Sequence, residues 1–450
     1  MSWLVRYGTF PFHQWTVGRK SLDWLRRLNQ SQWWEEAKIR TWQEEKLRFL
    51  LTHAMTSVPY YKTQFRPFSP EKESLFGRFQ DLPLLSKETA RKNFQELQAT
   101  DQNEPYTVVE TSGSTGFPMK WHIGRPAQQI REAARLRARG WWELRLGDPH
   151  VWVWGDDEIL GRRKAWRDLL IYNKRVVRLL DLSKETIEGH YRRLCRWKPT
   201  YLYGYPSGLV QLAQLCEGHR LSLKVLKVRG LVSTAEILTL SQRDFLEAAF
   251  DAPVINEYGC AEAQIIAFQC PQGRMHLNAD TLIVEFLKDG RPVQSGEQGE
   301  IVVTDLFNEI MPLIRYQTGD VGIPRPGRCP CGRTLPLMDL NIGREVEMIR
   351  LPDGRTIHPE VFIPPYNIDY FKPLSEWVER FRVIQEGPAQ FRVQVVTQEK
   401  FFPEVRERFK KLVEHYLGKD LQVEVDQVNE ISRDPSGKPR YFISKLNDRS

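Results

Sequence analysis

The feature that most constrains the fold is a change in hydrophobic periodicity near residue 281. Before this point, buried strands such as VWVWG (151–155) and APVINEYG (252–259) alternate with helical segments. That alternation indicates a parallel sheet of the α/β type. After it, TLIVEFL (281–287) and GEIVVTDLF (299–307) alternate apolar and polar residues. The second pattern indicates antiparallel strands with one solvated face.

The residues before and after this central region are also predicted to form helices and strands. Residues 31–57 carry apolar residues at helical spacing, a helix is expected over 126–146, and Ser86 is placed to cap a further helix. After about residue 343, several strands and one long helix (402–417) form an α+β pattern. We therefore expect an α/β protein. Its large N-terminal domain would hold mixed sheets, helices and an antiparallel subdomain, followed by a small α+β C-terminal domain.

Length and charge exclude several classes of protein. The 450 residues favour at least two domains, and the net charge of +8 is small for this length. No dense lysine and arginine run is present, so we expect no nucleic-acid partner. No apolar run approaches the roughly 20 residues that cross a bilayer. The N-terminus lacks the apolar core of a signal peptide, so a cytoplasmic protein is expected.

The basic, aromatic segment around Trp3, Trp15 and Trp24 leaves two interpretations open. It could touch a membrane surface, or it could be a helical arm packed on the body of the protein.

The stretch TSGSTGFPMK (111–120) follows a short β-branched strand and is rich in glycine and hydroxyl groups. Glycines let backbone amides point inward, and hydroxyls add further donors, so such a loop can wrap an anion. It lacks the spacing of a Walker A sequence. On its own, the stretch could equally be a plain turn.

Five motifs in order resemble those of the AMP-forming adenylating enzymes, the acyl-CoA synthetase superfamily. They are TSGSTGFPMK, NEYGCAE (256–262), RYQTGD (315–320), GREVEMIRLPDGRTIHP (343–359) and RDPSGK (433–438). The stretches LRFLLTHAMTSVPYYK, PTYLYGYPSGL and CPCGR resemble the branch of phenylacetate–CoA ligases and capsule-biosynthesis adenylating enzymes. The resemblance extends from about residue 35 to 445.

The resemblance implies a domain order and a reaction. Residues 1–342 would form an adenylation domain with a helical N-terminal arm, 343–350 a hinge, and 351–450 a mobile lid. ATP and a carboxylic acid, expected to be aryl, would give an acyl-adenylate and pyrophosphate. Transfer to CoA as a thioester would follow, and a homodimer stays possible.

The same resemblance assigns roles to individual residues. The catalytic set would be Lys438, Thr115 and Glu262, with Glu262 as the Mg²⁺ ligand. Tyr258 would stack on adenine, Asp320 would accept hydrogen bonds from the ribose, and Arg344 would reach ribose or phosphate. The remaining nucleotide-binding positions would be Thr111, Ser112, Gly113, Ser114, Gly116, Ala235, Glu236, Asn256, Glu257 and Gly259.

Two further sites are expected. Tyr203, Tyr205, Pro206 and Ser207 lie where the branch lines its acid pocket, although these residues could equally be plain core.

The other site consists of Cys270, His276, Cys329 and Cys331. Three thiolates and one imidazole fit a closed tetrahedral structural zinc site, and related enzymes carry a similar set. The alternative is unconnected buried thiols and a satisfied histidine.

Three departures from the family pattern leave the second step open. Met119 displaces the loop lysine, Ala261 stands where relatives have a hydroxyl, and Val346–Glu347 replaces two aspartates. The acyl acceptor could therefore be CoA, or a carrier protein, sugar or amine in polysaccharide assembly. A nucleotide-binding homologue without turnover is a third interpretation, which the presence of Lys438, Glu262 and Asp320 disfavours.

Overall fold

The computed structural model describes most of the chain. The described ranges are 1–66, 68, 75–101, 104–110, 119–154, 162–340, 349–353, 355–357, 359–362, 373–418, 420–431 and 442–447. The predicted phosphate loop residues Thr111, Ser112, Gly113, Ser114, Thr115 and Gly116 lie outside them, as do Arg344, most of the predicted hinge and Lys438.

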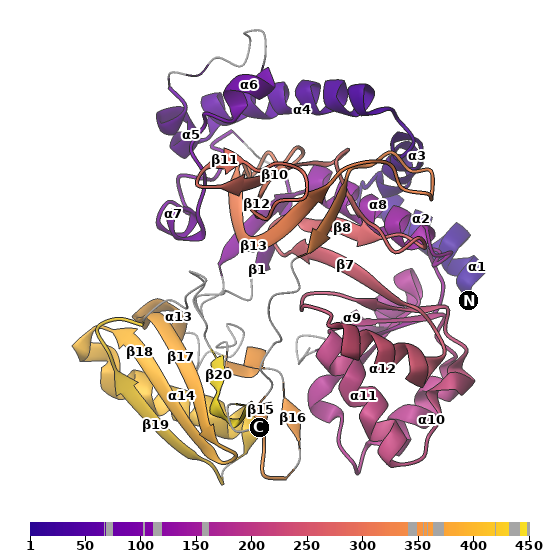
Figure 1. The fold of residues 1–450 in the computed structure, drawn as a ribbon, viewed down its shortest axis with the longest axis vertical. Coiled ribbons are helices and arrows are strands. Elements are labelled where there is room, and N and C mark those ends of the chain that lie inside the picture. The colour runs from indigo at the N-terminus through magenta and orange to yellow at the C-terminus, as the bar shows by residue number, and fades with distance from the viewer. Residues whose placement is uncertain are drawn as a thin grey trace.

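A parallel arrangement of five strands forms the first part of the central sheet (Figure 1). Its spatial order is β7-β6-β5-β3-β4, and all neighbours in this order run parallel. The strands are β3 (His150–Trp154), β4 (Lys174–Arg178), β5 (Tyr201–Gly204), β6 (Gly230–Ser233) and β7 (Val254–Cys260). The α/β pattern predicted from the sequence is confirmed for these residues.

The same sheet continues with antiparallel strands beyond β7, to twelve strands in the described part of the chain. These are β8 (Gln264–Gln269), β9 (Met275–Leu277), β10 (Leu282–Lys288), β11 (Arg291–Pro292), β12 (Gly299–Asp305), β13 (Tyr316–Arg325) and β14 (Leu337–Leu340). Antiparallel pairing begins at β7 and β8, earlier than the periodicity near 281 predicted. Ile265, Ile266, Ala267 and Phe268 are all buried, so β8 shows no alternation that the sequence could reveal.

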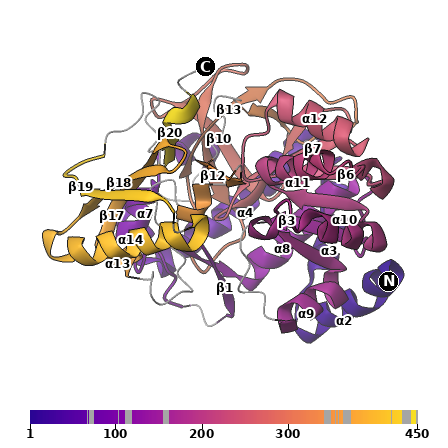
Figure 2. The ribbon, with the colours of Figure 1, turned by 90° about the horizontal axis from the view of Figure 1, so that it is seen from below.

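Helices cover the parallel part of the sheet, as Figure 2 shows from below. They are α8 (Arg125–Gly140), α9 (Arg162–Tyr172), α10 (Ile187–Trp197), α11 (Pro206–Gly218) and α12 (Leu240–Phe250). Helix α8 ends at Gly140, six residues before the predicted end at 146. Glycine is a poor helix former, and Glu143 takes a left-handed conformation with φ 56°, which cannot continue a helix.

The N-terminal part is helical; α3 packs on α8, η1 and α2 pack on α9, and α7 contacts β13. It comprises α1 (Ser2–Leu4), the π-helical turn η1 (Val5–Thr9), α2 (Phe10–Thr16), α3 (Ser21–Ser31), α4 (Glu36–Ser57), α5 (Pro59–Gln64), α6 (Leu75–Phe79) and α7 (Lys87–Lys92). The predicted cap is confirmed, because Ser86 Oγ accepts a hydrogen bond from Thr89 N at 3.1 Å. A hairpin of β1 (Tyr106–Glu110) and β2 (Lys120–Gly124) follows.

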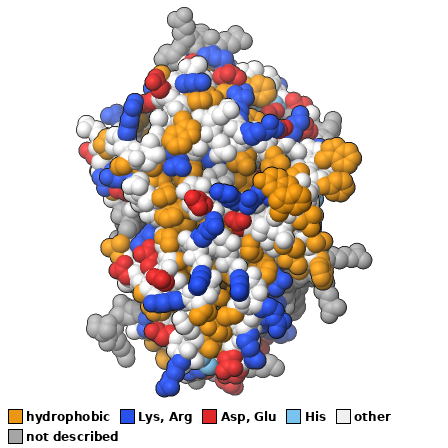
Figure 3. Space-filling model, turned by 90° about the vertical axis from the view of Figure 1, so that its right-hand side faces the viewer, with side chains coloured by type: hydrophobic (Ala, Val, Ile, Leu, Met, Phe, Trp, Pro, Cys, Tyr) orange, Lys and Arg blue, Asp and Glu red, His pale blue; other side chains and the backbone are white. Residues whose placement is uncertain are grey.

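The first helices also leave aromatic side chains exposed. Trp3 is 72% and Trp15 is 76% exposed, whereas Val5 and Phe10 between them are fully buried. Figure 3 shows hydrophobic side chains beside lysine and arginine on the face that carries these helices. Among the helices in the described ranges, none combines the length and apolar content needed to span a bilayer.

The residues from Ile349 onward form a core of their own. A four-stranded sheet has the order β19-β18-β17-β20 and packs against α14 (Phe402–Leu417). Its strands are β17 (Val378–Gly387), β18 (Gln390–Thr397), β19 (Gln422–Gln427) and β20 (Phe442–Ser444), beside β15 (Ile349–Arg350), β16 (Thr356–Ile357) and α13 (Leu374–Trp377). This is the predicted α+β pattern, with the helix at the predicted residues.

A buried ion pair fixes the N-terminal helices to the sheet. Arg137 of α8 and Asp280, which precedes β10, have side chains that are 0% exposed and are paired with each other. Arg137 also donates to the Asn278 side chain and to the Leu28 carbonyl, while Ser31 donates to Asp280. Three segments distant in sequence, α3, α8 and residues 278–280, therefore meet at one charge pair.

We expect Asp280→Ala to lower the free energy of unfolding by about 3–5 kcal/mol, because it leaves the Arg137 charge buried and unpaired. Urea unfolding followed by tryptophan fluorescence measures the change. Asp23→Ala, which removes an exposed ion pair with Arg26, is the control and should change it by less than about 1 kcal/mol. Equal losses of stability in both variants would contradict a structural role for the buried ion pair. The double variant Arg137→Met/Asp280→Leu, which replaces both charges by apolar side chains, should regain most of the stability that Asp280→Ala loses.

Candidate active site and metal centre

The carboxyl ends of β5, β6 and β7 form one edge of the parallel sheet, where the loops of α/β proteins commonly bind ligands. After β5, Pro206 starts α11, and Ser207 lies in its first turn. After β6, Ala235 takes a left-handed conformation with φ 66°, and Glu236 follows it. Glu236 accepts hydrogen bonds from Ser207 N at 3.1 Å and Ser207 Oγ at 2.7 Å. The two loops predicted from the sequence are therefore tied together.

Tyr258 and Asp320 meet across the sheet although they are far apart in the sequence. The Tyr258 hydroxyl at the end of β7 donates to Asp320 Oδ2 of β13 at 3.1 Å. Asp320 is itself held by the Thr318 hydroxyl, which accepts from the Asp320 amide at 3.1 Å. Burial, and then the Asp320 carboxylate, raise the pKa of Tyr258 well above its usual value. Tyr258 is therefore a neutral phenol at physiological pH.

Glu262 is a buried carboxylate, only 2% exposed, and not a surface residue. Its Oε1 accepts a hydrogen bond from the Tyr316 hydroxyl of β13 at 2.5 Å, and its carbonyl accepts one from Arg131 of α8. Arg131 also pairs with Asp305 Oδ2 at 2.7 Å. Burial and the Glu262 carboxylate raise the pKa of Tyr316 far above its usual value. Glu262 is thus oriented by residues from α8 and β13 that the sequence analysis did not select.

The remaining positions of NEYGCAE have structural partners. The backbone N–H of Asn256 donates to Gln269 Oε1 at 3.0 Å. The pairing register of β7 and β8 shifts between Tyr258 and Gly259. The Glu257 side chain lies on the face of the sheet that carries Tyr203, whose hydroxyl donates to Glu257 Oε1 at 2.8 Å. Glu257, which was predicted to bind the nucleotide, thus contacts a residue of the predicted acid pocket.

The predicted acid pocket is aromatic. Tyr203 and Tyr205 stack on Trp154 with ring centroids 5.6 Å and 4.2 Å away. Trp152 also contacts Tyr203, with ring centroids 4.7 Å apart. The sequence analysis treated VWVWG only as a strand, although two tryptophans at period two already indicated one aromatic face.

The four predicted metal ligands lie together. The Sγ atoms of Cys270, Cys329 and Cys331 and a ring nitrogen of His276 all lie within 4.8 Å of one another. Cys270 Sγ is 3.6 Å from Cys329 Sγ, and Cys331 Sγ is 3.3 Å from His276 Nε2. Around a zinc ion with Zn–S bonds of about 2.3 Å, neighbouring sulfurs would be about 3.8 Å apart.

The residues around His276 favour the neutral tautomer that could bind a metal ion through Nε2. His276 Nδ1 lies 3.0 Å from the Leu335 carbonyl, which can only accept, so Nδ1 carries the proton and the Nε2 lone pair faces the thiols. Burial lowers the pKa of His276 to about 4, which keeps the ring neutral. Cys270, His276 and Cys329 are buried. The donor set therefore fits a closed structural zinc site.

The segments that flank the predicted phosphate loop are described, although the loop is not. Strand β1 ends at Glu110, directly before it. Met119 after the loop is 5% exposed and belongs to the main hydrophobic core, while Lys120 is exposed. The methionine that displaces the loop lysine therefore has a packing role.

Comparison with known proteins connects this geometry to a family. Residues 352–445 match the family described as the CapK C-terminal domain. Protein CapK of Staphylococcus aureus is 23% identical over 252 residues, which span 55% of each chain. A phenylacetate–coenzyme A ligase of Thermus thermophilus is 24% identical over 90% of this chain and 96% of its own. The Escherichia coli ligase of the same name is 26% identical over 69% and 72%, respectively.

Solved structures share the fold. The crystal structure of 2-hydroxyisobutyryl-CoA ligase with 2-HIB-AMP and CoA superimposes with a TM-score of 0.62 at 20% identity, covering 93% of both chains. The same ligase in its postadenylation state gives 0.61. The large mixed sheet and the small C-terminal sheet are thus those of an acyl-CoA ligase fold. By its distant relatives, this chain belongs to the adenylate-forming acyl-CoA ligase superfamily, in the branch of the phenylacetate–CoA ligases and CapK.

Proposed function

We propose that this chain activates a carboxylic acid with ATP, forming an acyl-adenylate and pyrophosphate, and then transfers the acyl group to CoA. The observation that carries the proposal is the contact of Tyr258 with Asp320 beside the buried Glu262. These groups come from two distant motifs of the family and line the same edge of the sheet. The relatives named as CoA ligases support the same activity.

The acid and ATP are both anionic, so the site must supply positive charge and aligned donors. In the proposal, the loop from Thr111 to Gly116 holds the β- and γ-phosphates, with Thr115 beside the reacting phosphate. Asp320 accepts from the ribose, Arg344 reaches ribose or phosphate, and Tyr258 lies along the adenine. Ala235 and Glu236 border the adenine edge.

Two metal ions belong to the proposal. Mg²⁺ would be bound by Glu262, whose carboxylate the Tyr316 hydroxyl already orients, and it would neutralise phosphate charge. Zinc would be bound by Cys270, His276, Cys329 and Cys331, where it would join two segments of the antiparallel strands. The zinc role is structural, because four protein ligands leave no open position.

We propose the division at residues 343–350 as the hinge of a two-step reaction. The residues after it have their own core, so they could rotate as a unit. The match of residues 352–445 to the CapK C-terminal domain keeps an acceptor other than CoA as the second candidate. Omitting CoA from the assay separates the two, because only a CoA ligase needs CoA for continued turnover.

Lys438 is proposed to stabilise the charge that develops between the carboxylate and the α-phosphate. We expect Lys438→Ala to lower acid-dependent pyrophosphate release by about 10²–10³-fold, the usual effect of removing such a group. A panel of aryl and short-chain acids with ATP and Mg²⁺ provides the assay. Lys445→Ala is the control, because this lysine lies seven residues further along the chain and pairs with Glu386. It should leave the rate unchanged. Equal rates in wild type and Lys438→Ala would refute the role.

Zinc binding has a separate test. Protein grown with zinc should contain about one zinc per chain by elemental analysis, and Cys329→Ser should lose it and unfold at a lower temperature, because metal binding is coupled to folding. Cys195→Ser changes a cysteine outside the cluster and should retain the metal. Wild-type protein without zinc, or a Cys329→Ser variant with full zinc content, would exclude the site.

A further inference from the structure

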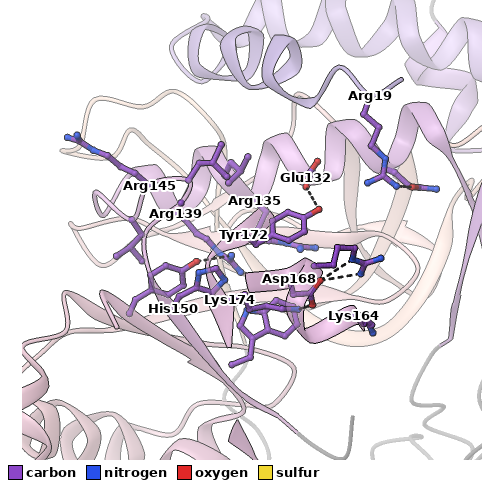
Figure 4. A pocket seen from close by; sticks show the side chains of 18 of the residues that line it. Arg19, Glu132, Arg135, Arg139, Arg145, His150, Lys164, Asp168, Tyr172 and Lys174 are labelled. Carbon is purple, nitrogen blue, oxygen red and sulfur yellow. Dashed lines mark hydrogen bonds and ion pairs between the residues drawn. The ribbon is translucent and has the colours of Figure 1, made fainter. Parts of the chain in front are cut away.

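A pocket of about 350 Å³ lies between α8, the strands β3 and β4, and the helix α9 (Figure 4). Thr107 and Val109 of β1 form part of its wall, so the pocket borders the strand that leads directly into the predicted phosphate loop. Trp152 also lines the pocket, and its ring contacts Tyr203 of the predicted acid pocket with the ring centroids 4.7 Å apart. His150, Lys174 and Tyr201, the first residues of β3, β4 and β5, also line the pocket, so it lies at the amino ends of these strands and borders the predicted acid pocket at Trp152.

The lining of this pocket is strongly cationic. Seven of the lining residues are lysine or arginine, and two are carboxylates, Glu132 and Asp168. Asp168 already pairs with Lys174 at 2.7 Å and with Arg167 at 3.2 Å. Glu132 accepts hydrogen bonds from the Ser21 hydroxyl at 2.6 Å and the Tyr172 hydroxyl at 3.2 Å. The carboxylates are thus engaged in the wall, and a positive excess remains.

Arg139 of α8 is the decisive side chain. It is 6% exposed, and its guanidinium donates to the Tyr201 hydroxyl at 3.2 Å and lies 4.8 Å from the centre of the Tyr203 ring. Its Nε and Nη2 are buried, and no acceptor within the described residues reaches either atom. A buried guanidinium that keeps open donors is costly unless an anion completes its shell.

The groups around Arg139 keep it charged without supplying an ion pair. Burial opposes its charge, but Tyr201, Glu257 and Tyr203 together raise its pKa above the ordinary value. Glu257 Oε1 accepts the hydrogen bond of the Tyr203 hydroxyl, and Glu257 Oε2 is buried without a hydrogen-bond partner among the described residues. Burial, then Arg139, lowers the pKa of His150 to about 3, so His150 adds no competing positive charge.

We propose that the acid activated by this chain carries a second anionic group, carboxylate or phosphonate-like, and that Arg139 binds this group at the far end of the aromatic pocket. The inference rests on the proposed function, since it concerns the acid of that reaction. The rings of Trp152 and Trp154 pack on Tyr203, which in turn contacts Arg139, and such aromatic walls favour a planar group between the two anionic groups of the acid.

Binding of matched probes to the full chain, measured by calorimetry without ATP, tests the inference. Phenylacetate, 1,4-phenylenediacetate and 4-(phosphonomethyl)phenylacetate share one skeleton and differ only in the second group. Hexanoate and adipate form an aliphatic pair. At least one dianion should bind roughly ten- to hundredfold more tightly than its monoanion, the range expected for a charge-assisted hydrogen bond. The two aryl dianions distinguish carboxylate from phosphonate.

In the Arg139→Met variant, a dianion and its monoanion should bind about equally tightly, because only the dianion loses affinity. Because the variant also removes the positive charge that acts on the buried Glu257 carboxylate, its thermal unfolding is measured alongside, and only folded protein is compared. Arg145→Met, which changes an exposed arginine of the same pocket, should retain most of the preference. The inference would be overturned if every monoanion bound more tightly than its dianion, or if no dianion bound at all. It would also be overturned if Arg139→Met weakened the binding of monoanions and dianions equally.

Pyrophosphate release with the same compounds separates this inference from the proposed function. Dianion binding that depends on Arg139, without release from any acid, supports the anion site and contradicts the adenylation. Release from monoanions alone, with no dianion binding, supports the adenylation and contradicts the second anionic group.

Discussion

The burial of arginines along α8 is the constraint on which much of this structure depends. Arg131, Arg137 and Arg139 are all buried on one helix. A guanidinium cannot lose its charge, so each must be compensated where it lies. Arg137 is paired with Asp280 and thereby joins the N-terminal helices to the sheet. Arg131 is paired with Asp305 and bonds to the carbonyl of Glu262.

The third arginine differs from the other two in its surroundings. Arg139 packs on aromatic rings and lines a pocket, and its Nε and Nη2 are buried without an acceptor among the described residues. One helix thus links the stability of the fold, the orientation of the proposed Mg²⁺ ligand and the proposed recognition of the acid. The same physical requirement, compensation of a buried charge, accounts for all three.

The continuity of the central sheet brings the motifs together. Strand β7 pairs in parallel with β6 and antiparallel with β8, so the sheet changes type without a break. Tyr258 of β7 therefore contacts Asp320 of the antiparallel part. The Cys270, His276, Cys329 and Cys331 cluster lies in that antiparallel part as well, where bound zinc would fix its loops.

The sequence by itself determined the α/β centre, the antiparallel strands, the C-terminal α+β unit and the four clustered Cys and His residues. Periodicity reflects which side of each element is buried, and ligand type reflects coordination chemistry, so both are local properties. Only the tertiary structure decided the early change of pairing at β8, the Glu257–Tyr203 contact and the contacts of Arg131, Arg139 and Tyr316. These depend on which distant side chains meet in the interior, and the free energy of a buried charge is set by those neighbours.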